Sequence, residues 1–269
     1  MSVFEGRGVT AMLIGAFGLV VALLVLLPMT LVVLSAFAAQ WTMTILPSTY
    51  TLRWFELLQL RQLGPILGSL TIAALVGAAS ALFGTYAAYV VTRKRPPAAG
   101  VMDALLMTPI ALPTVVIGLG LLVAFHRPPL MLTGTPLIVA LAHFLIVFPF
   151  TYRSVTGVLE GLDPRYEEVA ASLGAGEPTI IGRVVVPLAA PGILSGFILS
   201  FALSMGELGA TTMVYPPAFR TMPVTIYSLV ERGFYAQGAA MSVILLAVGF
   251  AALVSLYFLQ GRLSRMADA

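Results

Sequence analysis

The chain has few side chains that could do chemistry, and their spacing limits which chemistry is open to them. Its two histidines, His126 and His143, lie far apart in the sequence, and neither has a carboxylate at the spacing of a metal site. Cysteine is absent, which excludes disulfides and thiolate metal ligands. We therefore predict no metal site and expect both histidines to be loop or packing residues.

The sequence also lacks the residues that catalysis would need. A P-loop requires Gly-Lys followed by Ser or Thr, and the only lysine, Lys94, lies between two arginines. Intramembrane hydrolases need paired acids or a His/Glu metal set. Here Glu207, Asp103 and Glu160 are single acids near different apolar runs. No catalytic residues are therefore predicted, and a membrane-embedded enzyme is a remote alternative.

The densest group of charges and turn residues is YEEVAASLGAGEPTIIGRVVVPLAAPG, residues 166–192. Just before it, Asp163 and Pro164 suit the N-cap and the first position of a helix, because Asp accepts an orphan amide and Pro has none to leave unpaired. Glu167 and Glu168 follow in the first turn, where negative charge favours the helix dipole. These residues predict a helix that begins near residue 164.

This helix is predicted to be short. Val169, Ala170 and Leu173 form an apolar stripe at helical spacing, and Gly174 and Gly176 then end the helix. A second short piece follows, from Pro178 to Pro187. Such pieces either lie on a membrane surface or dock into a partner's groove. Surface helices are usually rich in Lys and Arg, so the adjacent glutamates favour docking to a protein.

The rest of the chain reads as membrane-spanning. It is 59% hydrophobic and only 9% charged, against about 25% charged in ordinary soluble domains. A spanning helix needs roughly 20 apolar residues, and the first apolar run is too long for a signal peptide, so we expect it to be retained. Prolines predict kinks in the third and fourth spans. The six candidate spans are about 11–37, 66–92, 104–125, 135–158, 187–207 and 236–260.

The distribution of Lys and Arg predicts the orientation of these spans. Cytoplasmic segments carry an excess of Lys and Arg. Placing the N-terminus inside puts nine of the 14 cations in the cytoplasm, and the cluster at 93–95 favours this choice most strongly. Both termini and the loop at 160–186 are then cytoplasmic. The inside cations are Arg7, Arg93, Lys94, Arg95, Arg153, Arg165, Arg183, Arg262 and Arg265, and the outside ones Arg53, Arg61, Arg127, Arg220 and Arg232.

The loop at 160–186 resembles the cytoplasmic signature of permease subunits in binding-protein-dependent ABC importers. That signature runs Glu, two small residues, three residues, Gly, nine residues, Ile, one residue, Leu-Pro. The chain departs from it conservatively, with Val in place of one Ala, of Ile and of Leu. The six-span layout extends the resemblance to the whole chain. The matching residues are Glu168, Val169, Ala170, Gly174, Val184, Val186 and Pro187.

The resemblance implies what this loop does. In the family it is a coupling helix that sits in a cleft of the ATP-hydrolysing subunit. Carried over, Glu168 and Gly174 would be the main contacts, with the Glu pairing with an Arg of the ATPase and the Gly giving the turn. Glu167, Ala170 and Pro187 complete the candidate coupling residues.

A second stretch, SMGELGATTMVYPP at 204–217, holds the candidate residues of a substrate path or gate. Glu207 falls at or just beyond the outer end of the fifth span. A carboxylate in the membrane costs roughly 2.5–3.5 kcal/mol and is normally paired or lines a polar cavity. Alternatively, Glu207 reaches the interface and is solvated. Gly206 and Gly209 permit a helix break or a close approach, and Thr211 and Thr212 add hydroxyls.

The same stretch resembles the Gly-Glu-Phe/Leu-Gly-Ala-Thr segment of permeases for molybdate, sulfate, thiamine, ferric iron and 2-aminoethylphosphonate, which favours a role in the path. Its continuation, MVYPPAFRTMPVTIYSLVERGFYAQGAAMS, looks most like the 2-aminoethylphosphonate permeases. On the predicted outer face, Arg220 and Arg232 would suit a phosphonate. They are equally explained as solvated loop charges or as contacts to a partner's acidic surface.

The resemblance therefore implies an all-α polytopic membrane protein with six transmembrane helices and a cytoplasmic coupling helix, forming one transmembrane domain over residues 1–269. It implies import of a small solute, either 2-aminoethylphosphonate or another phosphonate, with sulfate or molybdate, ferric iron, thiamine and polyamines as alternatives. A secondary transporter would predict an inverted repeat and midplane charges, and it would leave the loop at 160–186 unexplained.

The same resemblance implies the partners. They are a cytoplasmic ATP-binding subunit that holds ATP and Mg, a second permease subunit that is identical or different, an external solute-binding protein and membrane lipid. We expect no cofactor on this chain and no nucleic-acid partner. The expected location is the inner membrane of a bacterium.

Overall fold

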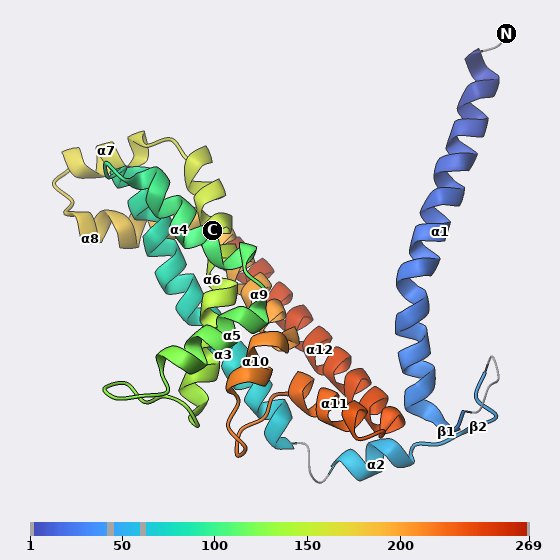
Figure 1. The fold of residues 1–269 in the computed structure, drawn as a ribbon. Coiled ribbons are helices and arrows are strands. Elements are labelled where there is room, and N and C mark those ends of the chain that lie inside the picture. Colours follow the sequence, from blue (N-terminus) through green and yellow to red (C-terminus); the bar gives the residue numbers. More distant parts are fainter. Residues whose placement is uncertain (1–2, 42–45, 60–62, 268–269) are drawn as a thin grey trace. The chain divides into compact units, whose positions relative to one another are not determined.

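The fold is taken from a computed structural model, which describes residues 3–41, 46–59 and 63–267 (Figure 1). The chain is an all-α polytopic membrane protein, as predicted. One small antiparallel hairpin interrupts the helices: β1 (Ala38–Gln40) pairs with β2 (Thr49–Tyr50). The chain divides into two compact units, the first made of residues 1–62 and 226–246 and the second of residues 63–225 and 247–269.

Three long helices form the centre of the second unit: α3 (Leu63–Tyr89), α6 (Pro136–Gly161) and α9 (Val186–Gly206). Small residues let their backbones approach closely, as is common between membrane helices. A Cβ added at Gly196 of α9 would lie 2.9 Å from the Cα of Thr151 on α6. Because the obstacle is backbone, this crossing requires glycine.

A buried group of hydroxyls also joins these three helices. Ser80 of α3 donates to Thr151 Oγ1 of α6 at 2.9 Å, and Thr151 Oγ1 lies 2.7 Å from Ser200 Oγ of α9. Ser200 in turn donates to the carbonyl of Val147 at 3.2 Å. All three hydroxyl residues are almost inaccessible to solvent. Since each hydroxyl has a partner, the group links the helices without leaving an unpaired polar atom.

The third predicted span differs from expectation, because it is broken. It consists of α4 (Ala99–Ala111) and α5 (Thr114–Ala124), which meet at an angle of 105°. Pro113 causes the break, since the residue before a proline is driven from the helical region, and Leu112 is extended with φ −96° and ψ 137°. The fourth span, by contrast, is one continuous helix, α6, that includes Pro149.

The first unit is built on α1 (Val3–Phe37), the hairpin and α2 (Arg53–Gln59). The indole of Trp54 donates to the carbonyl of Ala38 at 2.7 Å, and the ring centroids of Phe37 and Phe55 lie 5.0 Å apart. These contacts hold α2 against the end of α1.

The remaining elements of the chain are shorter, apart from the last helix. They are the π-helical turn η1 (Val90–Lys94), α7 (Arg165–Ser172), α8 (Glu177–Ile180), the π-helical turn η2 (Ile181–Val185), α10 (Gly209–Val214), α11 (Met222–Glu231) and the long α12 (Tyr235–Ala267).

Within the described residues, five helices are long and apolar enough to cross a membrane, or six if α4 and α5 count as one span. This agrees with a multi-pass protein. The cation Arg61, used above to predict orientation, lies outside the described residues. The five helical segments are Ala11–Phe37, Leu63–Lys94, Pro136–Gly161, Glu177–Gly206 and Tyr235–Phe258.

Candidate functional site

The predicted coupling helix is α7, and it begins as the local sequence suggests. The carboxylate of Asp163 accepts the backbone amide of Arg165 at 2.9 Å, which satisfies an amide at the helix start. Pro164 precedes the first helical residue with φ −58°, a value already suited to a helix. Figure 1 shows α7 and α8 together at the end of the α3–α6–α9 bundle.

Gly174 ends α7 in the left-handed conformation, with φ +85°. Its amide donates to the carbonyl of Ala171 at 2.9 Å, and the amide of Ala175 donates to that of Ala170 at 3.1 Å. This pair of bonds is a Schellman motif, which glycine permits because it has no Cβ. The sharp turn predicted at Gly174 is therefore present.

The second short piece is not a separate helix, which corrects the expectation for Pro178 to Pro187. α8 passes through η2 directly into α9, so that residues 177–206 form one apolar helical segment. The π-helical turn η2 joins α8 to α9 without a break, since the residues on either side of it, Ile180 and Val186, are also helical. We call residues 162–185 the coupling segment: it contains α7, the glycine turn, α8 and η2.

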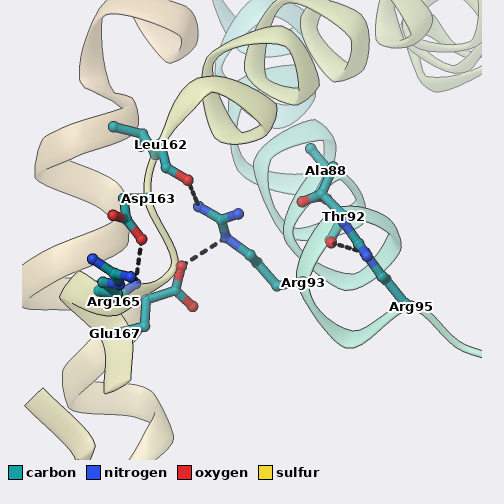
Figure 2. Close-up of polar contacts among 8 residues, drawn as sticks. All are labelled: Ala88, Thr92, Arg93, Arg95, Leu162, Asp163, Arg165 and Glu167. Atoms are coloured by element: carbon teal, nitrogen blue, oxygen red, sulfur yellow. Dashed lines mark hydrogen bonds and ion pairs between the residues drawn. The ribbon is translucent and has the colours of Figure 1, made fainter. Parts of the chain in front are cut away.

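The two adjacent glutamates have different surroundings. Glu167 Oε1 lies 2.7 Å from Nε of Arg93, at the end of α3, and its side chain is only 18% exposed. The same guanidinium donates through Nη2 to the carbonyl of Leu162 at 3.0 Å. Figure 2 shows Arg93 reaching between these two partners. Glu168, one residue on, is exposed.

A second ion pair lies beside the first. Nζ of Lys94 is 2.9 Å from Oε1 of Glu177, the first residue of α8, and the two side chains are 48% and 55% exposed. Pairs this exposed contribute little to stability, because water and salt screen their attraction. The Arg93–Glu167 pair is shielded from water, so it is the stronger of the two attachments.

The outer face of α7 is apolar and uncovered. Tyr166 and Val169 are each 58% exposed, and Leu173 is 83% exposed. They follow one another at helical spacing, with Glu168 beside them. At the edge of the same stripe, Ala170 is half-buried and packs against a buried cluster that includes Tyr152 and Leu159 of α6. α7 is therefore attached through Ala170 and Glu167, while Tyr166, Val169 and Leu173 stay uncovered.

Glu207 has a local partner at the break between α9 and α10. Its Oε1 accepts the backbone amide of Ala210 at 2.7 Å, so the carboxylate caps the start of α10. Gly206, the last residue of α9, is exposed, and Gly209 opens α10 beside Thr114 of α5. The helix break expected from these glycines is present.

The two candidate threonines both have partners. Thr211 Oγ1 lies 2.8 Å from Nε2 of His143, and Thr212 donates to the carbonyl of Gly209 at 2.8 Å. The other ring nitrogen of His143, Nδ1, lies 2.7 Å from Ser204 Oγ. His143 thus joins α6 to both helices beside the Glu207 break, and its side chain is buried.

The other charged candidates are placed separately. His126 lies exposed in the loop after α5, so it is a loop residue as expected, whereas His143 is a packing residue. Arg220 and Arg232 are both exposed. Asp103 of α4 accepts the hydroxyl of Tyr152 at 2.7 Å, which fixes α4 against α6.

Arg93 and His143 are the residues whose site contacts the sequence did not predict. In the sequence Arg93 stands out only as part of a basic cluster, and its partner Glu167 lies 74 residues away. His143 gave a weak signal as a single polar ring in a long apolar run. A polar side chain at such a depth needs a hydrogen-bond partner, but the sequence does not say which one.

Comparison with known proteins agrees with this architecture. Residues 80–266 match the family described as binding-protein-dependent transport system inner membrane component. The chain is 38% identical over 240 residues to a Salmonella typhimurium protein named as the 2-aminoethylphosphonate transport system permease PhnV, covering 89% of this chain and 90% of that one. It is 30% identical to the spermidine/putrescine permease PotC of Escherichia coli, over 77% of this chain and 78% of that one.

Solved structures share the fold. A chain of a bacterial ABC transporter involved in alginate import superposes with a TM-score of 0.72 at 17% identity, covering 97% of both chains. A chain of the MetNI methionine ABC transporter gives 0.61 at 15% identity, over 76% of this chain and 94% of that one. The chain therefore belongs to the binding-protein-dependent transport system inner membrane components, and it is the permease of an ABC importer.

Proposed function

We propose that this permease carries 2-aminoethylphosphonate, or a closely related phosphonate, from an external binding protein into the cytoplasm. The observation that carries the proposal is the 38% identity to PhnV over 89% of the chain. The polyamine permease PotC is more distant, at 30% identity over 77%. A polyamine is therefore the second candidate, and it differs in the sign of its charge.

The proposed mechanism assigns ATP hydrolysis to a separate subunit that binds ATP and Mg. The uncovered face of α7 supports docking to that subunit, because Tyr166, Val169 and Leu173 expose apolar surface at helical spacing. Glu168 lies beside this surface and is available to pair with a cation of the ATPase. Gly174 sets the turn, while Pro187 lies exposed in the first turn of α9.

For this docking, the coupling segment and both termini lie in the cytoplasm. The excess of Lys and Arg in the predicted inside segments supports that orientation. It leaves the Glu207 break near the outer side, where a solute-binding protein delivers the solute. A second permease subunit, identical or different, completes the path in this proposal.

The proposed path includes the α9–α10 break. Glu207 uses one oxygen to cap α10, and its second oxygen is the candidate contact for the amino group of 2-aminoethylphosphonate or for a polyamine. The exposed guanidinium groups of Arg220 and Arg232, which belong to different units, are separate candidates to attract a phosphonate. Both kinds of charge suit a solute that carries an ammonium and a phosphonate.

Reconstitution tests the proposal directly. This chain is co-expressed with its neighbouring ATPase and permease subunits and placed in proteoliposomes, and ATP hydrolysis is measured with the binding protein and one solute at a time. Stimulation by 2-aminoethylphosphonate, but not by sulfate, molybdate, ferric iron, thiamine or spermidine, is expected. Stimulation by spermidine alone would replace the phosphonate with a polyamine. Failure of the complex to form would count against the docking of α7.

A further inference from the structure

Two consecutive cations at the end of α3 contact the acidic residues that begin the two helical parts of the coupling segment. Arg93 contacts Glu167 in the first turn of α7, and Lys94 contacts Glu177 at the start of α8. We propose that Arg93 is a positioning residue of the transport cycle. Its guanidinium makes the coupling segment and the end of α3 move as one body. This inference rests on the proposed docking of α7 to the ATPase.

The two hydrogen bonds of Arg93 resist rotation of α7 relative to the end of α3, as well as separation of the two. Nη2 binds the carbonyl of Leu162, which directly follows α6, while Nε binds Glu167 after the start of α7 (Figure 2). The planar guanidinium is always charged and holds its donors in a rigid fork. One side chain of η1, the turn that continues α3, therefore fixes both ends of the short linker between α6 and α7.

Burial makes this contact persistent. The side chains of Arg93 and Glu167 are 12% and 18% exposed, so salt and water screen their attraction less than at the surface. Breaking the pair would leave a poorly solvated charge on either side. Lys94 and Glu177 are about half exposed and have no such constraint. They provide a matched control from the adjacent position.

The end of α3 is shaped to present Arg93. The last turn, η1, is π-helical, with the amide of Arg95 donating to the carbonyl of Val90 at 3.2 Å. Arg95 has φ 43°, which ends the helix there. Thr92 donates to the carbonyl of Ala88 at 2.7 Å, and Nε of Arg95 donates to that of Thr92 at 3.2 Å. π-helical turns occur frequently at functional sites.

α3 is suited to carry a displacement inward from this end. It packs along both α6 and α9, and its hydroxyl at Ser80 belongs to the buried group with Thr151 and Ser200. A movement of α7 that reaches α3 through Arg93 is therefore transmitted to the centre of the helix bundle. Without Arg93, α7 stays covalently joined to α6 and α9 and keeps the packing of Ala170, but it loses its ion pair with the end of α3.

The first test uses the absence of natural cysteines. The variant R93C/E167C is assembled with its ATPase, second permease and binding protein in proteoliposomes. Uptake of 2-aminoethylphosphonate per ATP hydrolysed is measured before and after linking the two thiols with a reducible bis-methanethiosulfonate reagent. We expect the unlinked variant to transport at least about fivefold less per ATP, the lower end of typical coupling factors. Linking the thiols should restore the wild-type uptake per ATP, and reducing the link should lower it again.

Two controls separate positioning from general stability. K94C/E177C, unlinked, should keep the wild-type ratio, and R93E/E167R should recover part of the ratio that R93E alone loses. A wild-type ratio in unlinked R93C/E167C would overturn the proposal. So would a further loss of transport on linking, because that would mean that α3 and α7 must move apart.

A second measurement does not depend on the solute. Spin labels on K94C and S172C report the distance between the end of α3 and the end of α7 in the assembled complex. With Arg93 present, we expect the same distance in the nucleotide-free and the ATP–vanadate states. Adding R93Q should broaden the distribution of distances. A shift of the distance between the two states with Arg93 present refutes the one-body movement.

These outcomes also separate the inference from the proposed function. If the complex forms but 2-aminoethylphosphonate is not carried, the proposed solute is wrong, while the spin-label distances still decide the role of Arg93. If the wild-type chain binds no ATPase, the docking of α7 is wrong and the inference about Arg93 falls with it.

Discussion

The carboxylate of Glu207 accepts the backbone amide of Ala210 at 2.7 Å, across the break that separates α9 from α10. This bond gives Glu207 a structural role in addition to any contact with solute. It also means that removing the side chain and removing only its charge are different experiments. An amide oxygen in place of Oε1 can still accept the Ala210 amide, whereas a methyl group cannot.

We therefore predict that Glu207→Gln impairs uptake while the complex still assembles. Gln keeps the cap on α10 but removes the charge that faces the proposed path. Glu207→Ala should in addition lower stability by about 0.5–2 kcal/mol, the usual loss when a side chain that satisfies an amide at a helix start is removed. Uptake kinetics and thermal unfolding in detergent measure the two effects. Normal uptake by the Gln variant, with a defect in the Ala variant alone, would limit Glu207 to capping.

The adjacent glutamates of α7 should behave differently when each is replaced by alanine. Glu168→Ala should weaken co-purification of the ATPase and leave thermal stability within about 0.5 kcal/mol, as expected for an exposed position. Glu167→Ala should lower stability by roughly 2 kcal/mol, because it leaves the half-buried guanidinium of Arg93 without its carboxylate. ATPase pull-down and thermal unfolding of both variants check this.

The opposite pattern would contradict the assignment. If Glu167→Ala kept its stability and lost the ATPase, Glu167 rather than Glu168 would face the partner.

Gly174→Ala should disturb the turn after α7. The left-handed conformation at φ +85° costs an alanine about 1–2 kcal/mol, so the coupling segment should either strain or change its path. We expect weaker ATPase binding in a titration of detergent-solubilised permease. Gly182→Ala is the control, since a Cβ there meets nothing within 4 Å and its φ is not positive. Equal affinities in both variants would mean that the shape of the turn is unimportant for docking.

Gly196→Ala tests the crossing of α6 and α9. The added methyl would lie 2.9 Å from Thr151 Cα, and a backbone obstacle cannot rotate away. The helices must separate, at an expected cost of about 1–3 kcal/mol from overpacking. Thermal unfolding in detergent measures this cost. Gly157→Ala on α6, where a Cβ meets nothing within 4 Å, should leave the midpoint unchanged or slightly raised. If Gly196→Ala were as stable as Gly157→Ala, the crossing of α6 and α9 would accommodate a methyl group and would not require glycine.

Much of the fold could be predicted because its causes are local. Long apolar runs require helices in lipid, since backbone polar groups have no water partner there. Asp163 and Gly174 set the start and end of α7 through bonds to neighbouring amides and carbonyls. The bend of 105° in the third span is a break and not the kink that its prolines predict. The sequence indicates that a proline bends a helix there, but it does not give the angle.

The sequence by itself determined the class of protein, the number of apolar runs and the place of the coupling loop. Only the tertiary structure decided which glutamate faces inward. Glu167 and Glu168 are neighbours of the same chemical type, and their difference arises because packing of α3 against α6 brings Arg93 to one of them. Likewise, the hydrogen bonds of His143 to Ser204 and Thr211 exist only because α6, α9 and α10 pack together. Contacts between distant residues depend on helix packing, which local sequence does not specify.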